Sequence, residues 1–287
     1  MTGRGTGSET PRTSLRRRAL GQHFLVDPGV AARIVEAVGA TPSDVVCEIG
    51  PGPGTLTWAL AARAGRLLAL EIDPALHTRL AQAARTWPDA VRVEIRLGDA
   101  RSFAYEELAA LRPAPDGRVL VAGNLPYSAS KPILARLFAA RAAIDAAVLM
   151  LQREVAERIT APPGGREYGA LSIFWQRWAE VTPLEVVPPD AFRPPPAVES
   201  AVIQIGFRAA PKVVVDDETL FAHVVRAAFG QRRKTLGNAL RGGGVGAPGH
   251  LAAALAAAAI DPGRRAETLS MEEFARLSDA LGRRAVQ

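Results

Sequence analysis

After a polar N-terminal stretch, short apolar runs alternate with segments of helical periodicity. The runs at 45–49 and 119–123 are almost wholly apolar, as expected of strands buried on both faces. The segments between such runs repeat apolar residues every three or four positions. This alternation predicts a doubly wound α/β fold with a parallel sheet. Strands are predicted at 45–49, 66–72, 91–97, 119–123 and 146–151, and helices at 28–38, 55–64, 75–86, 131–140 and 152–160.

The rest of the chain follows a different pattern. A helix is predicted at 171–179, and two β-like runs, 181–187 and 200–207, flank a proline-rich connection. Such a pair suits an antiparallel hairpin at the edge of a parallel sheet. Beyond residue 208 strand signals nearly vanish, and helices are predicted at 217–229, 232–240, 251–259 and 271–281. We therefore expect a disordered tail at 1–14, an α/β domain at 15–208 and a small all-α domain at 209–287.

Glycines and acids stand at the predicted carboxyl ends of successive strands, where open α/β sheets bind their ligands. Gly50 and Gly52 lie in a turn between the first strand and its helix, and glycines there let a ligand approach the backbone closely. Glu71 ends the next strand and can accept hydrogen bonds from ribose hydroxyls. Asp99 follows the third strand, where it can bond an adenine amino group. These positions predict a nucleoside-containing cofactor.

The glycine turn distinguishes between two such cofactors. A nicotinamide dinucleotide fingerprint needs a third glycine or alanine where this chain has Thr55. Glu48, just before the first glycine, can instead meet a cation, which favours S-adenosylmethionine with its amino group and sulfonium. The sequence therefore predicts a Rossmann-like class I methyltransferase sheet.

The run Asn124, Leu125, Pro126 and Tyr127 follows the fourth predicted strand. We hypothesise that the Asn124 side-chain oxygen and the Leu125 carbonyl accept the two N–H bonds of an adenine N6 amine. Pro126 fixes the backbone, and Tyr127 offers a face on which a base can stack. Phe192 is expected to close on the other face of the adenine.

The composition indicates a polyanionic partner such as a nucleic acid. The chain has 287 residues and a net charge of +6, and its positive charge is nearly all arginine, which suits phosphate and base recognition. RNA contacts are expected at Arg16, Arg17, Arg18, Arg153, Arg158, Arg232, Arg233 and Lys234, and the all-α domain at 209–287 is expected to bind RNA. For the run at 231–234 this expectation rests on its opening a helix, where the helix dipole would otherwise disfavour cations.

Other chemistries find little support in the sequence. The single cysteine, Cys47, excludes a disulfide framework and a cysteine-based metal site, and the four histidines show no ligand spacing, so no metal is expected. No stretch approaches the length of a membrane span, and the N-terminus lacks an apolar signal region. A cytoplasmic protein without a membrane partner, and a monomer, is expected.

Taken together, the motifs at 21–25, 48–54, 71–73, 98–100, 123–127, 168–169, 192–202 and 229–236 resemble those of the KsgA-type ribosomal RNA adenine N6,N6-dimethyltransferases. The resemblance covers about 17–240. It implies S-adenosylmethionine as cofactor, held by His23, Leu25, Gly50, Glu71, Asp99 and Asn124. It also implies a substrate: two adjacent adenosines near the 3′ end of 16S rRNA in the precursor of the small ribosomal subunit, each methylated twice.

Two alternatives stay open at this point. One is a 23S rRNA adenine N6-methyltransferase of the kind that confers macrolide resistance, which the motifs at 194–202 and 231–235 disfavour. The other is a mainly non-catalytic checkpoint factor that binds the immature small subunit during ribosome assembly.

Overall fold

The computed structural model describes residues 22–87 and 92–283, which form two compact units. The first extends to Arg153 and includes Leu184–Gln204, and the second contains Glu154–Pro183 and the chain from Ile205 onward. Residues 154–183 were predicted to belong to the first domain, at 15–208, but they lie in the second unit. The reason is their apolar side chains, such as Tyr168 and Ile173, which belong to the core of the second unit. The tail expected at 1–14 lies outside the described residues.

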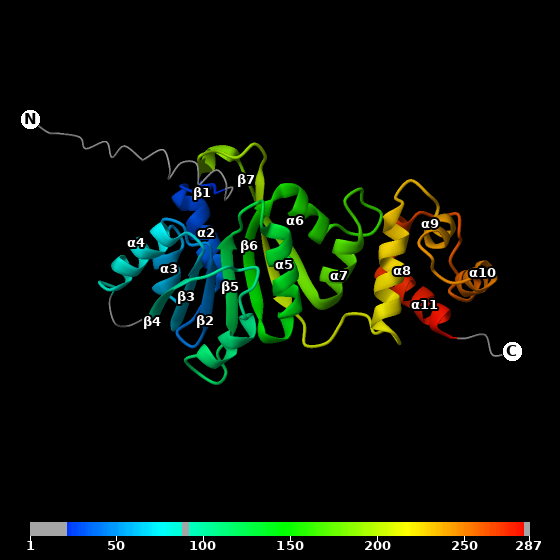
Figure 1. Cartoon of the computed structure of the whole chain (residues 1–287), viewed down its shortest axis with the longest axis horizontal. Coiled ribbons are helices and arrows are strands. Elements are labelled where there is room, and N and C mark those ends of the chain that lie inside the picture. The colour runs from blue at the N-terminus through cyan, green and yellow to red at the C-terminus, as the bar shows by residue number, and fades with distance from the viewer. Residues whose placement is uncertain (1–21, 88–91, 284–287) are drawn as a thin grey trace, which may run out of the picture. The chain divides into compact units, whose positions relative to one another are not determined.

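A seven-stranded sheet with the order β4-β3-β2-β5-β6-β9-β7 organises the fold (Figure 1). Pairing is parallel between β2 and β3, β3 and β4, β2 and β5, and β5 and β6. The chain runs outward from β2 to β4 and then returns to the other side of β2, so the strand order reverses between β2 and β5. Ligands of open α/β sheets bind at such a switch point. The strands are β2 Val45–Ile49, β3 Arg66–Glu71, β4 Arg92–Leu97, β5 Val119–Asn124, β6 Ala146–Gln152, β7 Ala179–Val187 and β9 Ser200–Phe207.

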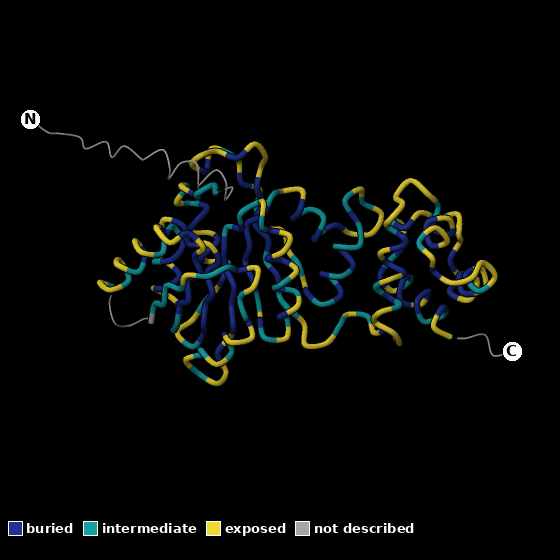
Figure 2. The backbone as a smooth tube through the Cα atoms, in the orientation of Figure 1, coloured by how far each residue is buried: buried dark blue, intermediate teal, exposed yellow. Residues whose placement is uncertain are grey.

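Helices cover this sheet because its strands are apolar on both faces. Every residue of β2 is buried, and Figure 2 shows the central strands buried while the outer faces of the helices are exposed. Helix α2 begins at the Asp27 cap, whose side chain accepts the N–H groups of Gly29 and Val30, and ends at Gly39 with a left-handed φ of 58°. The helical segments of this part are α2 Pro28–Val38, α3 Thr57–Ala61, α4 Pro74–Ala84, η1 Tyr105–Leu111, α5 Ser130–Ala139, η2 Arg141–Ala143 and η3 Pro189–Ala191. Helix α6 Arg153–Thr160 belongs to the second unit from its second residue onward.

A two-stranded antiparallel sheet, absent from the sequence prediction, joins β1 Phe24–Leu25 to β8 Phe192–Arg193. Strands of two residues are too short to leave a periodic signal. The pairing matters because it fixes the segment 22–25, which is far from the glycine turn in sequence, next to that turn.

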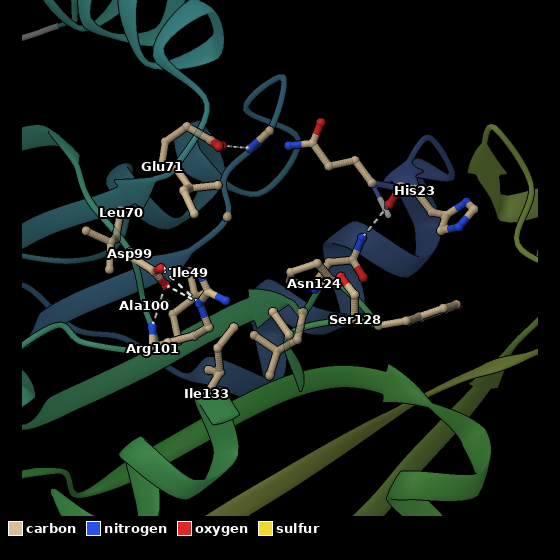
Figure 3. A pocket seen from close by; sticks show the side chains of 18 of the residues that line it. His23, Ile49, Leu70, Glu71, Asp99, Ala100, Arg101, Asn124, Ser128 and Ile133 are labelled. Atoms are coloured by element: carbon tan, nitrogen blue, oxygen red, sulfur yellow. Dashed lines mark hydrogen bonds and ion pairs between the residues drawn. The ribbon is translucent and has the colours of Figure 1, made fainter. Parts of the chain in front are cut away.

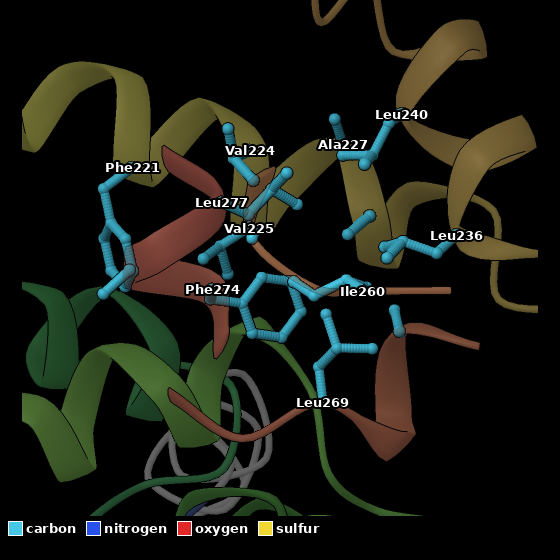
Figure 4. Packing of buried hydrophobic residues seen from close by; sticks show 14 of the residues in the cluster. Phe221, Val224, Val225, Ala227, Leu236, Leu240, Ile260, Leu269, Phe274 and Leu277 are labelled. Carbon is cyan, nitrogen blue, oxygen red and sulfur yellow. The ribbon is translucent and has the colours of Figure 1, made fainter. Parts of the chain in front are cut away.

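The second unit is helical around its own core. Its helical segments are α7 Ala170–Trp178, α8 Glu218–Gly230, α9 Leu236–Gly242, α10 Pro248–Ala257, η4 Ala266–Thr268 and α11 Met271–Gly282. Figure 4 shows Phe274 of α11 within the apolar cluster that includes Val225 and Leu269. None of the helices in the described ranges is long and apolar enough to span a membrane.

Helix α9 begins at Leu236, so the run 231–234 forms a turn between α8 and α9. The interpretation that this run opens a helix is therefore wrong. Thr235 caps α9, and the three cations precede it. The helix-dipole argument for their function does not apply to them.

Candidate active site

A cavity of about 340 Å³ lies at the carboxyl ends of β2, β3 and β5 and beside the loop after β4 (Figure 3). It combines backbone from the glycine turn with acidic, amide and aromatic side chains. The predicted residues His23, Gly50, Gly52, Glu71, Asp99, Asn124, Leu125, Pro126 and Tyr127 all line it.

The glycine turn is shaped by its left-handed residues. Gly50 and Gly52 have φ angles of 65° and 58°, which side chains other than glycine rarely adopt. A Cβ atom at Gly52 would also stand 2.8 Å from the Phe24 ring. The turn can therefore be this tight only with glycine, and β1 closes over it.

Glu71 holds the turn from the neighbouring strand. Its Oε2 accepts the N–H of Gly52 at 3.1 Å, and its Oε1 accepts the N–H of Asp73 at 2.8 Å. Burial raises the pKa of the Glu71 carboxyl, although these backbone hydrogen bonds oppose the rise. A carboxylate has about four acceptor sites, so Glu71 retains capacity for a ribose hydroxyl beside its backbone hydrogen bonds.

Asp99 is bound by a residue that the sequence analysis missed. Both oxygens of Asp99 accept hydrogen bonds from the Arg101 guanidinium, at 2.5–3.0 Å, and both residues line the cavity. The hydrogen bond from Arg101 lowers the pKa of Asp99, so this carboxyl is ionised near neutral pH. Its Oδ1 also accepts the backbone N–H of Arg101 at 2.9 Å, so Arg101 occupies acceptor sites on both oxygens.

The amide of Asn124 is held in one orientation. Its Nδ2 donates to the His23 carbonyl at 2.8 Å, so its Oδ1 is the atom left to accept (Figure 3). In the following loop, Pro126 and Tyr127 have their carbonyls bonded by Ala129 N and Ser130 Oγ, whereas no described residue donates to the Leu125 carbonyl. Two unused acceptors therefore lie on adjacent residues at the cavity wall.

Tyr127 is fixed from two sides. Its hydroxyl is 2.6 Å from the Oγ of Ser200, a residue with no exposed surface. The His23 ring packs on the Tyr127 ring with the centroids 5.5 Å apart. His23 is itself oriented, because its Nδ1 donates to the Pro194 carbonyl at 2.8 Å.

Two predicted residues support the cavity without lining it. Phe192 has no exposed surface and packs in a buried apolar cluster, so the expectation that it closes on an adenine is corrected. The cause is its pairing with Leu25, which turns both side chains inward. Leu25 does not line the cavity. Its carbonyl accepts a hydrogen bond from the Thr55 hydroxyl at 3.0 Å, which ties β1 to the glycine turn.

Glu48 is also enclosed. It is 1% exposed, its Oε2 has no partner among the described residues, and it does not line the cavity. Burial raises its pKa to about 8, against the effect of the nearby Thr57 hydroxyl. The expectation that Glu48 meets the cofactor's positive charge is therefore corrected, since at neutral pH it is mostly a neutral acid inside the protein.

Replacing Glu48 by Gln should make stability less sensitive to pH. The folded pKa of about 8 lies above the ordinary value of 4.5, so the wild-type free energy of unfolding falls as pH rises from about 4.5 to about 8. The neutral amide lacks this term. We expect E48Q to gain roughly 3–4 kcal/mol relative to wild type between pH 5 and pH 8, measured by urea unfolding. A difference that stays constant over this range would contradict the burial argument.

The remaining lining residues were not among the predicted site residues, although several of them lie in the motifs at 21–25, 48–54, 71–73 and 98–100. Gln22 has a buried Oε1 without a described partner, which is an acceptor available to a bound molecule. Phe24 and Ile133 supply apolar walls from separate elements. The other missed residues are Ile49, Leu70, Ile72, Gly98, Ala100, Arg101, Ser128 and Ala129. Most of them neighbour a predicted residue, so the strand-end rule could have found them.

The cavity fits S-adenosylmethionine on these observations. Left-handed glycines leave room along the turn, Glu71 and Asp99 provide ionised or hydrogen-bonded acceptors at neighbouring strand ends, and Gln22 provides an unused one. Among the described residues no group of three or more His, Cys, Asp or Glu side chains is arranged to hold a metal ion.

The predicted RNA-binding residues are placed differently from one another. Arg16, Arg17 and Arg18 lie outside the described residues. Arg153 pairs with Glu199 at 2.8 Å and Arg158 with Glu154 at 2.7 Å.

The three cations of the turn at 231–234 also differ in their contacts. The Arg232 guanidinium donates to the carbonyls of Arg166 and Tyr168, which gives it a structural role in holding that loop. Arg233 and Lys234 are exposed, and their side chains form no hydrogen bond or ion pair with a described residue.

Comparison with known proteins gives one consistent result. The family model "Ribosomal RNA adenine dimethylase" matches residues 13–282. The chain is 46% identical to "Ribosomal RNA small subunit methyltransferase A" of Geobacter metallireducens, over 92% of this chain and 95% of that one. It is 45% identical to the protein of the same name from Pelotomaculum thermopropionicum, over 92% and 91%. Among solved structures, the 23S rRNA methyltransferase ErmE matches at 26% identity with a TM-score of 0.70, covering 91% of this chain and all of that one.

Proposed function

Because the chain belongs to the ribosomal RNA adenine dimethylase family, we propose that it transfers methyl groups from S-adenosylmethionine to adenine N6 amines of small-subunit rRNA. The target is a pair of adjacent adenosines near the 3′ end of 16S rRNA, each methylated twice. The enzyme acts as a monomer on a precursor of the small subunit, in the cytoplasm where that particle forms.

One observation carries the proposal. Two unused acceptors, the Asn124 Oδ1 and the Leu125 carbonyl, stand on consecutive residues of one cavity wall. An adenine N6 amine has two N–H groups that match them. The amine is a poor nucleophile because its lone pair is delocalised into the ring. Accepting both N–H bonds would hold the nitrogen pyramidal and free the lone pair for attack.

The other residues of the cavity would bind the cofactor and the target base. S-adenosylmethionine, when bound, supplies an electrophilic methyl group. Glu71 and Asp99 would hold its ribose and adenine, with Gly50 and Gly52 along its methionine part. Tyr127 would stack on the target base, which must leave its own stack at a cost of a few kcal/mol. Fixed positions of this kind can lower a barrier by about 7–11 kcal/mol in favourable cases.

The alternative substrate, 23S rRNA, is less well supported. ErmE shares 26% identity with this chain, whereas the small-subunit relatives share 45–46% over similar lengths. A purely non-catalytic assembly role would not require the oriented Asn124 amide, although binding to an immature subunit is compatible with catalysis.

The proposal is tested by mapping N6,N6-dimethyladenosine in rRNA from cells with and without the gene. We expect two dimethylated adenosines near the 3′ end of 16S rRNA to disappear on deletion and to return with the wild-type gene. Loss of methylation from 23S rRNA instead, or an unchanged pattern, would refute it. Assays on assembled small subunits against naked RNA then identify the preferred substrate.

Ser200 should act as a positioning residue for Tyr127. Replacing Ser200 by Ala removes the 2.6 Å hydrogen bond to the tyrosine hydroxyl, so the stacking face loses its fixed angle. We expect kcat to fall about tenfold with little change in KM for S-adenosylmethionine, consistent with one lost hydrogen bond. Tyr127→Phe should show a similar loss, and the double variant no more than either alone. Additive losses would mean that the two residues act independently.

A further inference from the structure

The helical unit contains a second cavity, of about 370 Å³, in the groove between α10 and α11. Each helix contributes four residues spaced i, i+3, i+4 and i+7, so each presents one continuous stripe to the groove. We call this site the α10/α11 cleft. It is lined by His250, Ala253, Ala254 and Ala257 of α10, by Arg276, Asp279 and Ala280 of α11, and by Arg283, the residue that caps the end of α11.

The charged side chains of the cleft are two arginines and one aspartate, and Arg276 also interacts electrostatically with Glu272 and Glu273 of α11. Arg276 and Arg283 are exposed and lie about 10.5 Å apart along the α11 axis. Neither side chain forms a hydrogen bond or ion pair with a described residue. Asp279, the acid in the lining, already accepts the N–H of Asp216 at 3.0 Å. The two guanidinium groups therefore offer their donors to an outside anion.

Three other arginines of this unit are engaged internally, whereas Arg233, like the cleft pair, forms no hydrogen bond or ion pair with a described residue. Arg264 forms ion pairs with Glu273, and Arg177 forms them with Glu218. Arg232 is bonded to loop carbonyls. The pair in the cleft differs from these, since its hydrogen-bonding capacity is not used within the described chain.

The shape of the cleft suits a polymer backbone. Ala253 and Ala257 are exposed on α10, so no long side chain on this stripe blocks close approach. The Nε2 of His250 is buried and has no partner among the described residues, which leaves a polar group at the end of the same stripe.

From these features we propose that the α10/α11 cleft binds the sugar–phosphate backbone of the RNA substrate, through Arg276 and Arg283. The inference rests on the proposed function, which supplies a polyanionic partner. Guanidinium groups form forked hydrogen bonds with phosphate, and such contacts position a nucleic acid without reading its sequence. The cleft thus anchors RNA at a site that does not include the residues of the active-site cavity.

The test compares two double variants by filter binding of a 16S rRNA transcript between 50 and 200 mM salt. R276A/R283A removes the two cleft cations, and the control R208A/R265A removes two exposed arginines of the same unit that have acidic partners. Losing two phosphate contacts should make the plot of log K against log salt shallower by about 1.4–1.8. The wild type would then lose about tenfold more affinity over this range than R276A/R283A. The control should keep the wild-type slope.

Several outcomes would overturn the proposal. Equal changes in both double variants would mean a diffuse effect of net charge, and an unchanged slope in R276A/R283A would mean that the cleft does not touch RNA. Unaltered RNA binding with weaker binding to assembled subunits would assign the cleft to a ribosomal protein. Calorimetry with S-adenosylmethionine tests whether the active-site unit of both double variants is still folded and binds the cofactor. If the wild type neither binds nor methylates the transcript or assembled subunits, the proposed function fails as well.

Discussion

Replacing Asn124 by Ala should lower kcat for methyl transfer about 10²- to 10³-fold, as is typical when one hydrogen-bonding group aimed at the reacting atoms is removed. The affinities for RNA and S-adenosylmethionine should change little, because other residues supply most of those contacts. The measurement is single-turnover transfer of labelled methyl groups to 16S rRNA in small subunits, with binding measured separately. Near-normal turnover in this variant would show that Asn124 is not the acceptor for the substrate amine.

The expected loss follows from the way the amide is held. Its Nδ2 is bonded to the His23 carbonyl, so the Oδ1 needs no reorganisation before it accepts an N–H of the substrate amine. Alanine removes this acceptor and leaves the Leu125 carbonyl alone. The second methylation should suffer at least as much when the one remaining N–H of the monomethylated amine points to the Asn124 Oδ1, because that N–H has no acceptor in the variant. The ratio of mono- to dimethyladenosine should therefore rise in the residual product.

Asn124→Asp provides the matched control. Aspartate keeps an oxygen at the position of Oδ1 but cannot donate to the His23 carbonyl, and its charge is repelled by that oxygen. We expect N124D to be nearly as inactive as N124A. Substantial activity in N124D would show that an acceptor alone suffices and that the bond to the N-terminal segment is dispensable.

Much of the architecture could be predicted from the sequence because its signals are local. The run at 45–49 is apolar except for Glu48 and forms β2 with the predicted bounds, and Asp27 with Pro28 marks the start of α2. Residues at strand ends, such as Glu71 and Asp99, are brought together by parallel pairing, which the alternation of strands and helices already implies.

Side-chain direction and long-range pairing could not be predicted in this way. Phe192 and Glu48 stand in the expected motifs, but tertiary packing turns both side chains into the interior. The bond from Tyr127 to Ser200 joins residues 73 positions apart, and no periodicity reports such a contact. Arg101 was missed because its importance depends on the rotamer that brings its guanidinium onto Asp99.

Replacing Glu71 by Ala should weaken binding of S-adenosylmethionine by about 10²- to 10³-fold, because hydrogen bonds to a charged acceptor contribute about 1.5–3 kcal/mol each. The variant loses the acceptor for the ribose hydroxyls. It also leaves the N–H groups of Gly52 and Asp73 without their partner, so the glycine turn is released. Isothermal titration with S-adenosylmethionine and S-adenosylhomocysteine measures the loss.

Two comparisons separate the ribose contact from general destabilisation. Asp73→Ala removes the cap of α4, from a residue that does not line the cavity, and should cost stability without a comparable loss of affinity. Glu71→Gln keeps one oxygen and should bind with intermediate affinity. Because burial raises the pKa of Glu71, the wild-type carboxylate is protonated nearer to neutral pH than an ordinary one. Wild-type affinity should therefore fall as pH is lowered from 7.5 to 5, whereas that of E71Q should stay flatter. If the affinities of both proteins depended on pH equally, a residue other than Glu71 would have to hold the ribose.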